Sequence, residues 1–434
     1  AIALGILLVA AFLWTTEAVP LFVTSFIVLG LNLVWLAPDL RSRGHAVSSD
    51  AFLAPFFSDL ILLFLGGFVL AAALERYGLD RSIARAILRR AGRRVPSVIA
   101  ALMAVTAVLS MWLSNTAATA LMLGLSLPLV DALPPEGGAR KALLLSVPLA
   151  ANVGGLGTPI GTPPNAIVLE YLAREGHAVS FAGWVAIGLP AVIVMLVILW
   201  AAVLALFGGR GVELAGGTAG TGPHPGVGGE DEDREARFGR RLVVVVTGVT
   251  LLGWLLGGTV GLSPGTVSIL PVGVFFGFGL LRVADFRRLS WDVLFLMGGG
   301  LCLARSLELS GLADWLVAGI PTEGVAPGLL AAAFLVVSCG MSTVMSNTAT
   351  ANLLAPLVAG LEGVDLPPVF LALAFGCSFA MALPISTPPN AMAFATGQLR
   401  AGDLLRVGLV ATGSGVLLTV TVFFAWWALL GVTG

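Results

Sequence analysis

Apolar stretches about as long as a membrane is thick recur along the whole chain, and they constrain its fold more than any other feature. Of the 434 residues, 58% are hydrophobic and only 11% are charged. About 25% of the residues in a soluble domain are charged, so this composition excludes a soluble globular domain. A helix needs about 20 apolar residues to cross the hydrocarbon core of a bilayer. The sequence therefore predicts an all-α, polytopic membrane protein.

We expect ten membrane crossings and two segments of another kind. The crossings are predicted at residues 2–18, 20–37, 56–75, 141–172, 183–207, 241–261, 265–281, 291–310, 368–396 and 405–431. The apolar segments 96–130 and 329–359 instead carry a polar Ser-Asn-Thr in the middle. Each half has about 15 residues, too few to cross. Because polar tips at membrane depth are tolerated only beside protein or a water-filled cavity, both segments are predicted to be re-entrant helical hairpins.

The positions of the positive charges predict the orientation. If the first span starts outside the cell, 19 of the 23 Lys and Arg residues fall in cytoplasmic segments, in agreement with the positive-inside rule. The first hairpin then lies in the cytoplasmic half of the membrane, the second lies in the outer half, and the C-terminus is outside. We expect a multi-pass protein of the inner (plasma) membrane, with one more helix before Ala1.

The second half of the chain repeats the first. Three matches occur in the same order: residues 59–75 with 292–308, the Ser-Asn-Thr at 114–116 with that at 346–348, and the Thr-Pro-Pro-Asn at 162–165 with that at 387–390. Each repeat would hold five crossings and one hairpin. Since five is odd, the second copy must be inverted. Inverted repeats with broken helices are typical of secondary transporters.

The repeats predict how the chain is divided. Residues 1–207 form the first repeat, 241–434 form the second, and the Gly-rich and acidic stretch 208–240 is a flexible cytoplasmic linker. Arginines at helical spacing in 79–94, with isoleucines opposite, predict an amphipathic helix in the cytoplasmic interface. Segment 312–320 is its shorter partner in the second repeat.

The Ser-Asn-Thr motifs place hydroxyls, an amide and free backbone N–H groups near the membrane midplane. The start of a helix can hold an anion there without a buried Lys or Arg. Ser110 precedes Ser114 by one turn on the same helical face, and Ser342 precedes Ser346 in the same way. These hydroxyls, the Asn side-chain oxygens and unwound carbonyls suit a Na⁺ cage. One such motif would more often link helices structurally, but duplication in two short segments favours function.

The Thr-Pro-Pro-Asn motifs interrupt apolar helices. Two prolines remove N–H donors and disfavour helix before them. The freed carbonyls, such as that of Gly161, can face a cation, and the helix that restarts can face an anion. A single proline kink is usually structural. Here residues 386–390 repeat the whole double-proline helix break downstream of the second hairpin, which favours a functional role.

With both Ser-Asn-Thr motifs, both Thr-Pro-Pro-Asn loops and the Thr-Glu-Ala-Val-Pro turn at 16–20, the sequence resembles the divalent anion/sodium symporter family of dicarboxylate, citrate and sulfate carriers. The similarity covers nearly the whole chain. It implies a homodimer with an elevator mechanism. A scaffold of residues 1–75 and 241–310 would hold a moving transport part, residues 95–207 and 326–434.

The resemblance also implies site residues, with Na⁺ as the coupling ion and no organic cofactor. The first sodium site would use Ser110, Ser114, Asn115 and the Gly161 carbonyl, and the second would use Ser342, Ser346, Asn347 and the Ser386 carbonyl. The substrate would contact Asn115, Thr116, Thr162, Pro163, Asn347, Thr348, Thr387 and Pro388. Ser386 stands where the family often has Ala, which bears on the choice of substrate.

We therefore expect sodium-coupled symport of small divalent anions, above all C4-dicarboxylates. The alternatives are a sodium-independent dicarboxylate exchanger of the same fold, a citrate or sulfate carrier, an arsenite or sodium/proton carrier, and a channel. A proton-coupled carrier should place an Asp or Glu at the broken helices, and neither 154–165 nor 381–390 has one. A channel needs a continuous polar pore. No enzyme motif occurs, and a net charge of −1 gives no argument for nucleic acid.

Other charged residues in the spans favour structural roles. Glu75 and Glu308 lie at matching span ends, where an interfacial position is expected. Asp59 and Asp292 occupy positions expected for helix N-caps. Arg305 has no counterpart in the first repeat, and it should either pair with an acid or extend to the interface.

Overall fold

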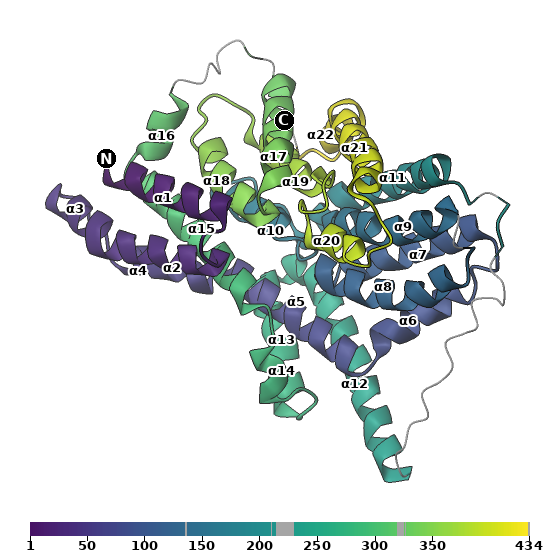
Figure 1. The fold of residues 1–434 in the computed structure, drawn as a ribbon. Helices are drawn as coiled ribbons and strands as arrows, with labels where there is room; N and C mark the ends of the chain where they lie inside the picture. The colour runs from purple at the N-terminus through teal and green to yellow at the C-terminus, as the bar shows by residue number, and fades with distance from the viewer. Residues whose placement is uncertain (135–136, 210, 214–229, 319–324, 326, 433–434) are drawn as a thin grey trace.

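The computed structural model describes residues 1–134, 137–209, 211–213, 230–318, 325 and 327–432, and these fold almost entirely into helices (Figure 1). The described residues contain no strand, only an isolated bridge between Arg94 and Glu213. In this part of the chain, five helical stretches are long and apolar enough to cross a membrane by length and composition: Leu21–Ser42, Asp50–Arg76, Phe181–Phe207, Arg237–Val260 and Ala401–Leu429. The all-α prediction is confirmed.

The N-terminal helices and α15 form one side of the molecule (Figure 1). They are α1 (Ile2–Thr16), α2 (Leu21–Leu31), which continues through a π-helical turn into α3 (Ala37–Ser42), α4 (Asp50–Leu53) and α15 (Trp291–Leu309). A buried polar contact links α15 to the π-helical turn, because the Ser306 hydroxyl donates to Asn32 Oδ1 at 2.8 Å. Such contacts hold helices together where the surroundings are equally apolar.

A second group consists of α5 (Asp59–Arg76), α12 (Glu230–Leu256), α13 (Pro264–Gly277) and α14 (Val283–Arg287). The prediction that Asp59 and Asp292 are N-caps is wrong, because Ser58 and Ser290 hold those positions. The Ser58 hydroxyl accepts from the Ile61 N–H at 3.4 Å. The Asp59 carboxylate instead accepts from the Gly265 N–H at 3.2 Å and so joins α5 to α13. A local pattern could not distinguish Ser58 from the adjacent Asp59 as the cap. At α15 the Ser290 side chain makes no cap bond.

Both segments with a central Ser-Asn-Thr form pairs of helices. They are α7 (Val95–Ser110) with α8 (Asn115–Asp131), and α17 (Pro327–Val344) with α18 (Asn347–Ala359). In each pair the second helix starts at the Asn of the motif, after a Ser in extended conformation. The predicted interruption of both segments is therefore present.

Both Thr-Pro-Pro-Asn motifs break a helix, as predicted. The first break separates α9 (Gly138–Gly154) from α10 (Pro163–Arg174), and the second separates α19 (Leu366–Phe379) from α20 (Pro388–Phe394). Every residue of α19 is buried, as is every residue of α9 from Ala142 onward. A helix that is apolar all round is expected at such a central position.

Short helices follow α5 and α15 in the same way. They are α6 (Leu79–Leu88) and α16 (Leu312–Val317). Each is preceded by a left-handed glycine, Gly78 at φ 59° and Gly311 at φ 65°, a conformation that glycine adopts without strain. Residues 319–320, at the end of the second predicted interfacial segment, lie outside the described residues.

The remaining helices are α11 (Phe181–Phe207), α21 (Ala401–Leu418) and, after a π-helical turn, α22 (Phe424–Leu429). Helix α11 lies beside α7 and α9, and α21 and α22 lie next to α11, on the side of the molecule away from α1 to α4 (Figure 1). Since α12 begins at Glu230, the end of the expected linker 208–240 is helical. Residues 210 and 214–229 lie outside the described residues.

Candidate functional site

A cavity of about 410 Å³ lies where the two helix pairs and the two broken helices meet. All eight side chains predicted to contact substrate line it: Asn115, Thr116, Thr162, Pro163, Asn347, Thr348, Thr387 and Pro388. The wall of the cavity that faces these eight side chains is largely apolar and includes Phe64, Phe68, Val293 and Leu296. Sites for small molecules commonly combine such a volume with a few convergent polar groups.

The polar wall of the cavity is formed by the ends of helices. The first residues of α8, α10 and α18 line it, and Thr387 caps α20 at the same place. Helix N-termini carry partial positive charge, which favours an anion. The starts of α8 and α18 also offer free N–H groups, whereas α10 and α20 each begin with two prolines, which have none. Among the described residues that line the cavity, Asp292 is the only charged one. The positive potential therefore comes from backbone dipoles and not from Lys or Arg.

A first cluster of oxygens lies behind the tip of the α7–α8 pair. The buried Ser110 hydroxyl lies 2.6 Å from Asn115 Oδ1 and 2.7 Å from the Ala151 carbonyl oxygen. With the Asn115 amide turned over, its nitrogen donates to the carbonyls of Gly161 and Ala151, each at 3.2 Å. With the Asn115 oxygen in the position of that nitrogen, it faces the Ser110 hydroxyl and the two carbonyl oxygens, so that four oxygens face one another. Carbonyl oxygens only accept hydrogen bonds, so a bound cation favours the orientation with four facing oxygens.

A second cluster has the same construction behind the tip of the α17–α18 pair. The Ser342 hydroxyl lies 2.6 Å from Asn347 Oδ1 and 3.2 Å from the Cys377 carbonyl oxygen. The Ser386 hydroxyl takes a separate role: it donates to the Thr343 carbonyl at 3.0 Å and accepts from the Leu383 N–H at 3.1 Å. It thus links the second loop to the end of α17.

Ser114 and Ser346, both predicted as sodium ligands, cap helices. The Ser114 hydroxyl accepts from the Ala117 N–H at 3.2 Å, and the Ser346 hydroxyl accepts from the Ala349 N–H at 3.1 Å. Both residues line the cavity. Each cap satisfies one free N–H group at the helix start and leaves a second lone pair on the hydroxyl oxygen.

An asparagine holds each loop in its unwound conformation. Asn165 Nδ2 donates to the carbonyls of Gly155 and Thr158 at 2.9 and 2.8 Å. Asn390 Nδ2 donates in the same manner, at 3.0 Å to Met381 and at 2.9 Å to Leu383. These bonds satisfy carbonyls that a continuous helix would have paired.

Three contributors to the site were not predicted from the sequence. The carbonyls of Ala151 and Cys377 were missed because backbone oxygens carry no sequence signal of their own. Asn152 was also missed: it lines the cavity, and its amide bonds to Thr387 and Asn390. The sequence did contain a signal for Asn152, because an Asn inside an apolar span is rare enough to merit attention.

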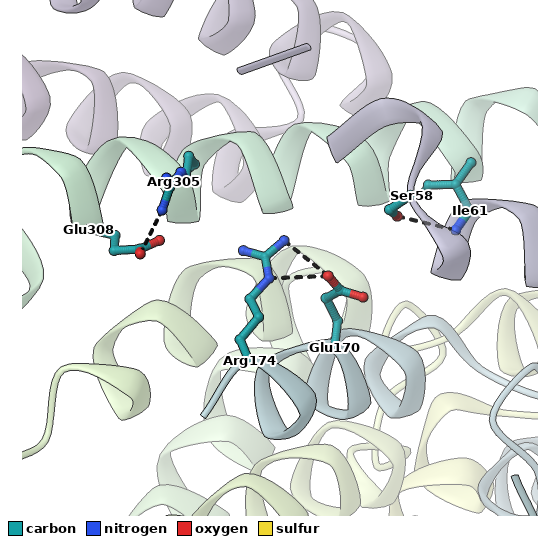
Figure 2. Close-up of polar contacts among 6 residues, drawn as sticks. All are labelled: Ser58, Ile61, Glu170, Arg174, Arg305 and Glu308. Carbon is teal, nitrogen blue, oxygen red and sulfur yellow. Dashed lines mark hydrogen bonds and ion pairs between the residues drawn. The ribbon is translucent and has the colours of Figure 1, made fainter. Parts of the chain in front are cut away.

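A second, larger cavity of about 770 Å³ lies between α10 and α15. Figure 2 shows its charged walls, where Arg174 pairs with Glu170 on one side and Arg305 pairs with Glu308 on the other. The Arg305–Glu308 distance of 2.6 Å decides between the two expectations for Arg305 in favour of pairing with an acid. None of the predicted site residues lines this cavity.

Comparisons with known proteins agree with this arrangement. The citrate transporter family (CitMHS) matches residues 11–376. The sodium-dependent dicarboxylate transporter SdcS of Staphylococcus saprophyticus is 31% identical over 99% of this chain and 86% of the relative. Its counterpart in Staphylococcus aureus is 30% identical with the same coverage. Among solved structures, the YdaH transporter of Alcanivorax borkumensis matches with a TM-score of 0.60 and 16% identity, covering 88% of this chain and 89% of that one. MtrF of Neisseria gonorrhoeae matches with a TM-score of 0.54 and 12% identity, covering 86% and 82%. These two likenesses concern the fold alone.

Proposed function

This chain belongs to the citrate transporter family, and we propose that it is a secondary active carrier that couples Na⁺ to the transport of small divalent anions, above all C4-dicarboxylates. It is a membrane transporter and not an enzyme. The observation that carries the proposal is a cavity flanked by two oxygen clusters of like construction. The relatives' names supply the substrate class, and the family description makes citrate the second candidate substrate.

The cavity suits a dianion whose two ends need separate partners. Asn115 and Thr116 start α8, and Asn347 and Thr348 start α18, so each motif can receive one carboxylate. Hydroxyl, amide and backbone N–H donors at a helix N-terminus bind carboxylate oxygens well. Thr162, Pro163, Thr387 and Pro388 would complete the walls from the two loops.

The two oxygen clusters suit Na⁺ and would account for coupling. The first would use Ser110, Ser114, Asn115 and the Gly161 carbonyl, with Ala151 as an added carbonyl ligand. The second would use Ser342, Ser346, Asn347 and the Ser386 carbonyl, with Cys377 as the added ligand. Asn115 and Asn347 belong to a cluster and also line the cavity. A bound Na⁺ would therefore orient each asparagine and offset the charge of the incoming anion, so that the fully loaded state is favoured.

The proposed movement is that of an elevator within a homodimer. In support of this, the largely apolar wall of the cavity comes from residues within 1–75 and 241–310, the proposed scaffold, and the polar wall comes from residues within 95–207 and 326–434, the proposed transport part. The matching bonds in the two clusters support an inverted repeat. The walls contributed by Pro20 and Ser290 lie near the predicted cytoplasmic ends of their helices, so the cavity would open inward with the C-terminus outside.

Uptake of radiolabelled succinate into proteoliposomes tests the proposal, with an inward gradient of Na⁺ compared with one of K⁺. We expect uptake that requires Na⁺ and is lost in both Asn115→Ala and Asn347→Ala. Uptake independent of Na⁺ but stimulated by internal dicarboxylate would instead identify an exchanger. Na⁺-dependent uptake that persists in both variants would refute the assignment of the sites.

A further inference from the structure

A single buried amide joins the two halves of the chain beside the cavity. Asn152, near the end of α9, is 2% exposed. Its Nδ2 donates to Thr387 Oγ1 at 3.0 Å and to Asn390 Oδ1 at 3.2 Å. The partners lie 235 and 238 residues further along the chain. A contact between such distant residues fixes the first helix break relative to the second.

Asn152 stands between the two oxygen clusters. The residue before it, Ala151, contributes its carbonyl to the first cluster. Of its two partners, Thr387 directly follows Ser386, whose carbonyl belongs to the proposed second site. The other partner, Asn390, holds the unwound carbonyls of Met381 and Leu383. One side chain therefore connects the residue next to Ala151 with the loop of the proposed second site.

Among the described residues, the equivalent positions of the second half make no such link to the first break. Ser378 follows Cys377 as Asn152 follows Ala151, yet its buried hydroxyl has no hydrogen-bond partner among the described residues. Asn165 Oδ1, the counterpart of the Asn390 oxygen that Asn152 reaches, is also buried without a partner there. Among the described residues, the connection between the two helix breaks is thus made from one side only, by Asn152.

The oxygen of the same amide argues against a merely structural bond. Asn152 Oδ1 is buried and has no hydrogen-bond partner in the part of the chain that the structure describes. A buried acceptor without a partner lowers stability. If this residue served only to pack α9 against α20, an apolar side chain here would make the protein more stable. The bonds from the amide nitrogen to Thr387 and Asn390 are therefore what this residue contributes in place of apolar packing.

We infer that Asn152 is a positioning residue that couples the two cation sites. It holds the second loop in place relative to the Ala151 carbonyl, so that a cation in the first cluster pre-orders the second. The second cation then binds to a loop that is already ordered. Its binding costs less conformational entropy, and this gives positive cooperativity. The inference rests on the proposed function, since it requires that the clusters bind Na⁺.

Asn152→Ser in the full chain tests the coupling by shortening the side chain to that of Ser378. We expect the Na⁺ concentration for half-maximal succinate uptake to rise about 10-fold, in line with the loss of a group that orients metal ligands. The Hill coefficient for Na⁺ should also fall towards 1. Asn152→Ala should behave alike, and a cooperative thermal melt in detergent verifies that each variant is folded.

Ser146→Ala is the matched control. Ser146 is buried on the same helix, and its hydroxyl donates only to the Leu143 carbonyl of that helix. The control should keep the Na⁺ dependence of the unaltered protein. A lower melting temperature or maximal rate in both Asn152 variants, with the Hill coefficient and Na⁺ requirement unchanged, would overturn the inference and leave the proposed function intact. Na⁺-independent uptake by the unaltered protein would overturn the proposed function and, with it, the inference.

Discussion

Gly155, which directly follows α9, offers a sharp test of the first oxygen cluster. A Cβ at this position would lie 2.7 Å from Asn115 Oδ1, 3.1 Å from Asn115 Nδ2 and 3.2 Å from the Gly161 carbonyl oxygen. Ordinary contacts begin at 3.4 Å. The neighbour best able to move is the end of the Asn115 side chain, because the Gly161 carbonyl belongs to the backbone. The variant Gly155→Ala therefore displaces one proposed Na⁺ ligand without altering any.

The size of the effect follows from this displacement. To reach ordinary contact, Asn115 Oδ1 must move by about 0.7 Å, more than the roughly 0.5 Å within which a binding group must be held. Displacing a metal ligand through its surroundings typically weakens affinity about 10- to 100-fold. We thus expect the half-maximal Na⁺ concentration to rise by that factor, equivalent to about 1.4–2.7 kcal/mol.

The assay is Na⁺-dependent succinate uptake into proteoliposomes, titrated from low to saturating Na⁺. Gly124→Ala is the matched control, because Gly124 lies on α8 with nothing within 4 Å of an added Cβ. It should leave the Na⁺ requirement unchanged. If folded Gly155→Ala protein requires no more Na⁺ than the control, the first cluster does not bind the coupling ion and the reasoning fails.

Two further predictions concern stability. Asn165→Ala removes the donors to the Gly155 and Thr158 carbonyls, and we expect it to cost about 3 kcal/mol, because each buried acceptor left unpaired costs about 1–3 kcal/mol. The measurement is thermal unfolding in detergent, and a melting temperature equal to that of the unaltered protein would contradict the role of Asn165. The pKa of Glu175, just after α10, is raised by partial burial and by the nearby Glu308 carboxylate. When the pKa of a carboxyl group is higher in the folded protein than in the unfolded chain, the folded state becomes less stable as pH rises from the unfolded-state pKa to the folded-state pKa. Glu175→Gln should therefore raise the melting temperature at pH 7 and flatten its decline above about pH 4.5, and an unchanged decline would show that Glu175 does not titrate in this way.

The resemblance to sodium-coupled carriers of dicarboxylates and citrate is confirmed by the family match and the curated relatives. The assignment of individual residues to Na⁺ and substrate remains a prediction, as do the inverted repeats, the homodimer and the elevator movement. The structure brings all eight predicted substrate residues to one cavity. It also places Ser110 and Ser342 behind the asparagines of the two motifs.

The sequence by itself determined the membrane class, the two interrupted segments and both helix breaks. These properties are local: hydrophobicity acts along a single helix, and a proline removes its own N–H donor wherever it stands. The interruptions at Ser114 and Ser346 and the breaks at Pro163 and Pro388 could therefore be read without knowing what packs against them.

Only the tertiary structure decided which atoms complete the site. The carbonyls of Ala151 and Cys377, the link from Asn152 to Thr387 and the bond from Ser386 to Thr343 all join segments that are distant in sequence. Backbone oxygens are the same in every residue, so a sequence cannot reveal which of them face a cluster. Their positions follow from how buried helices such as α9 and α19 pack, and packing depends on contacts among residues that no local pattern relates.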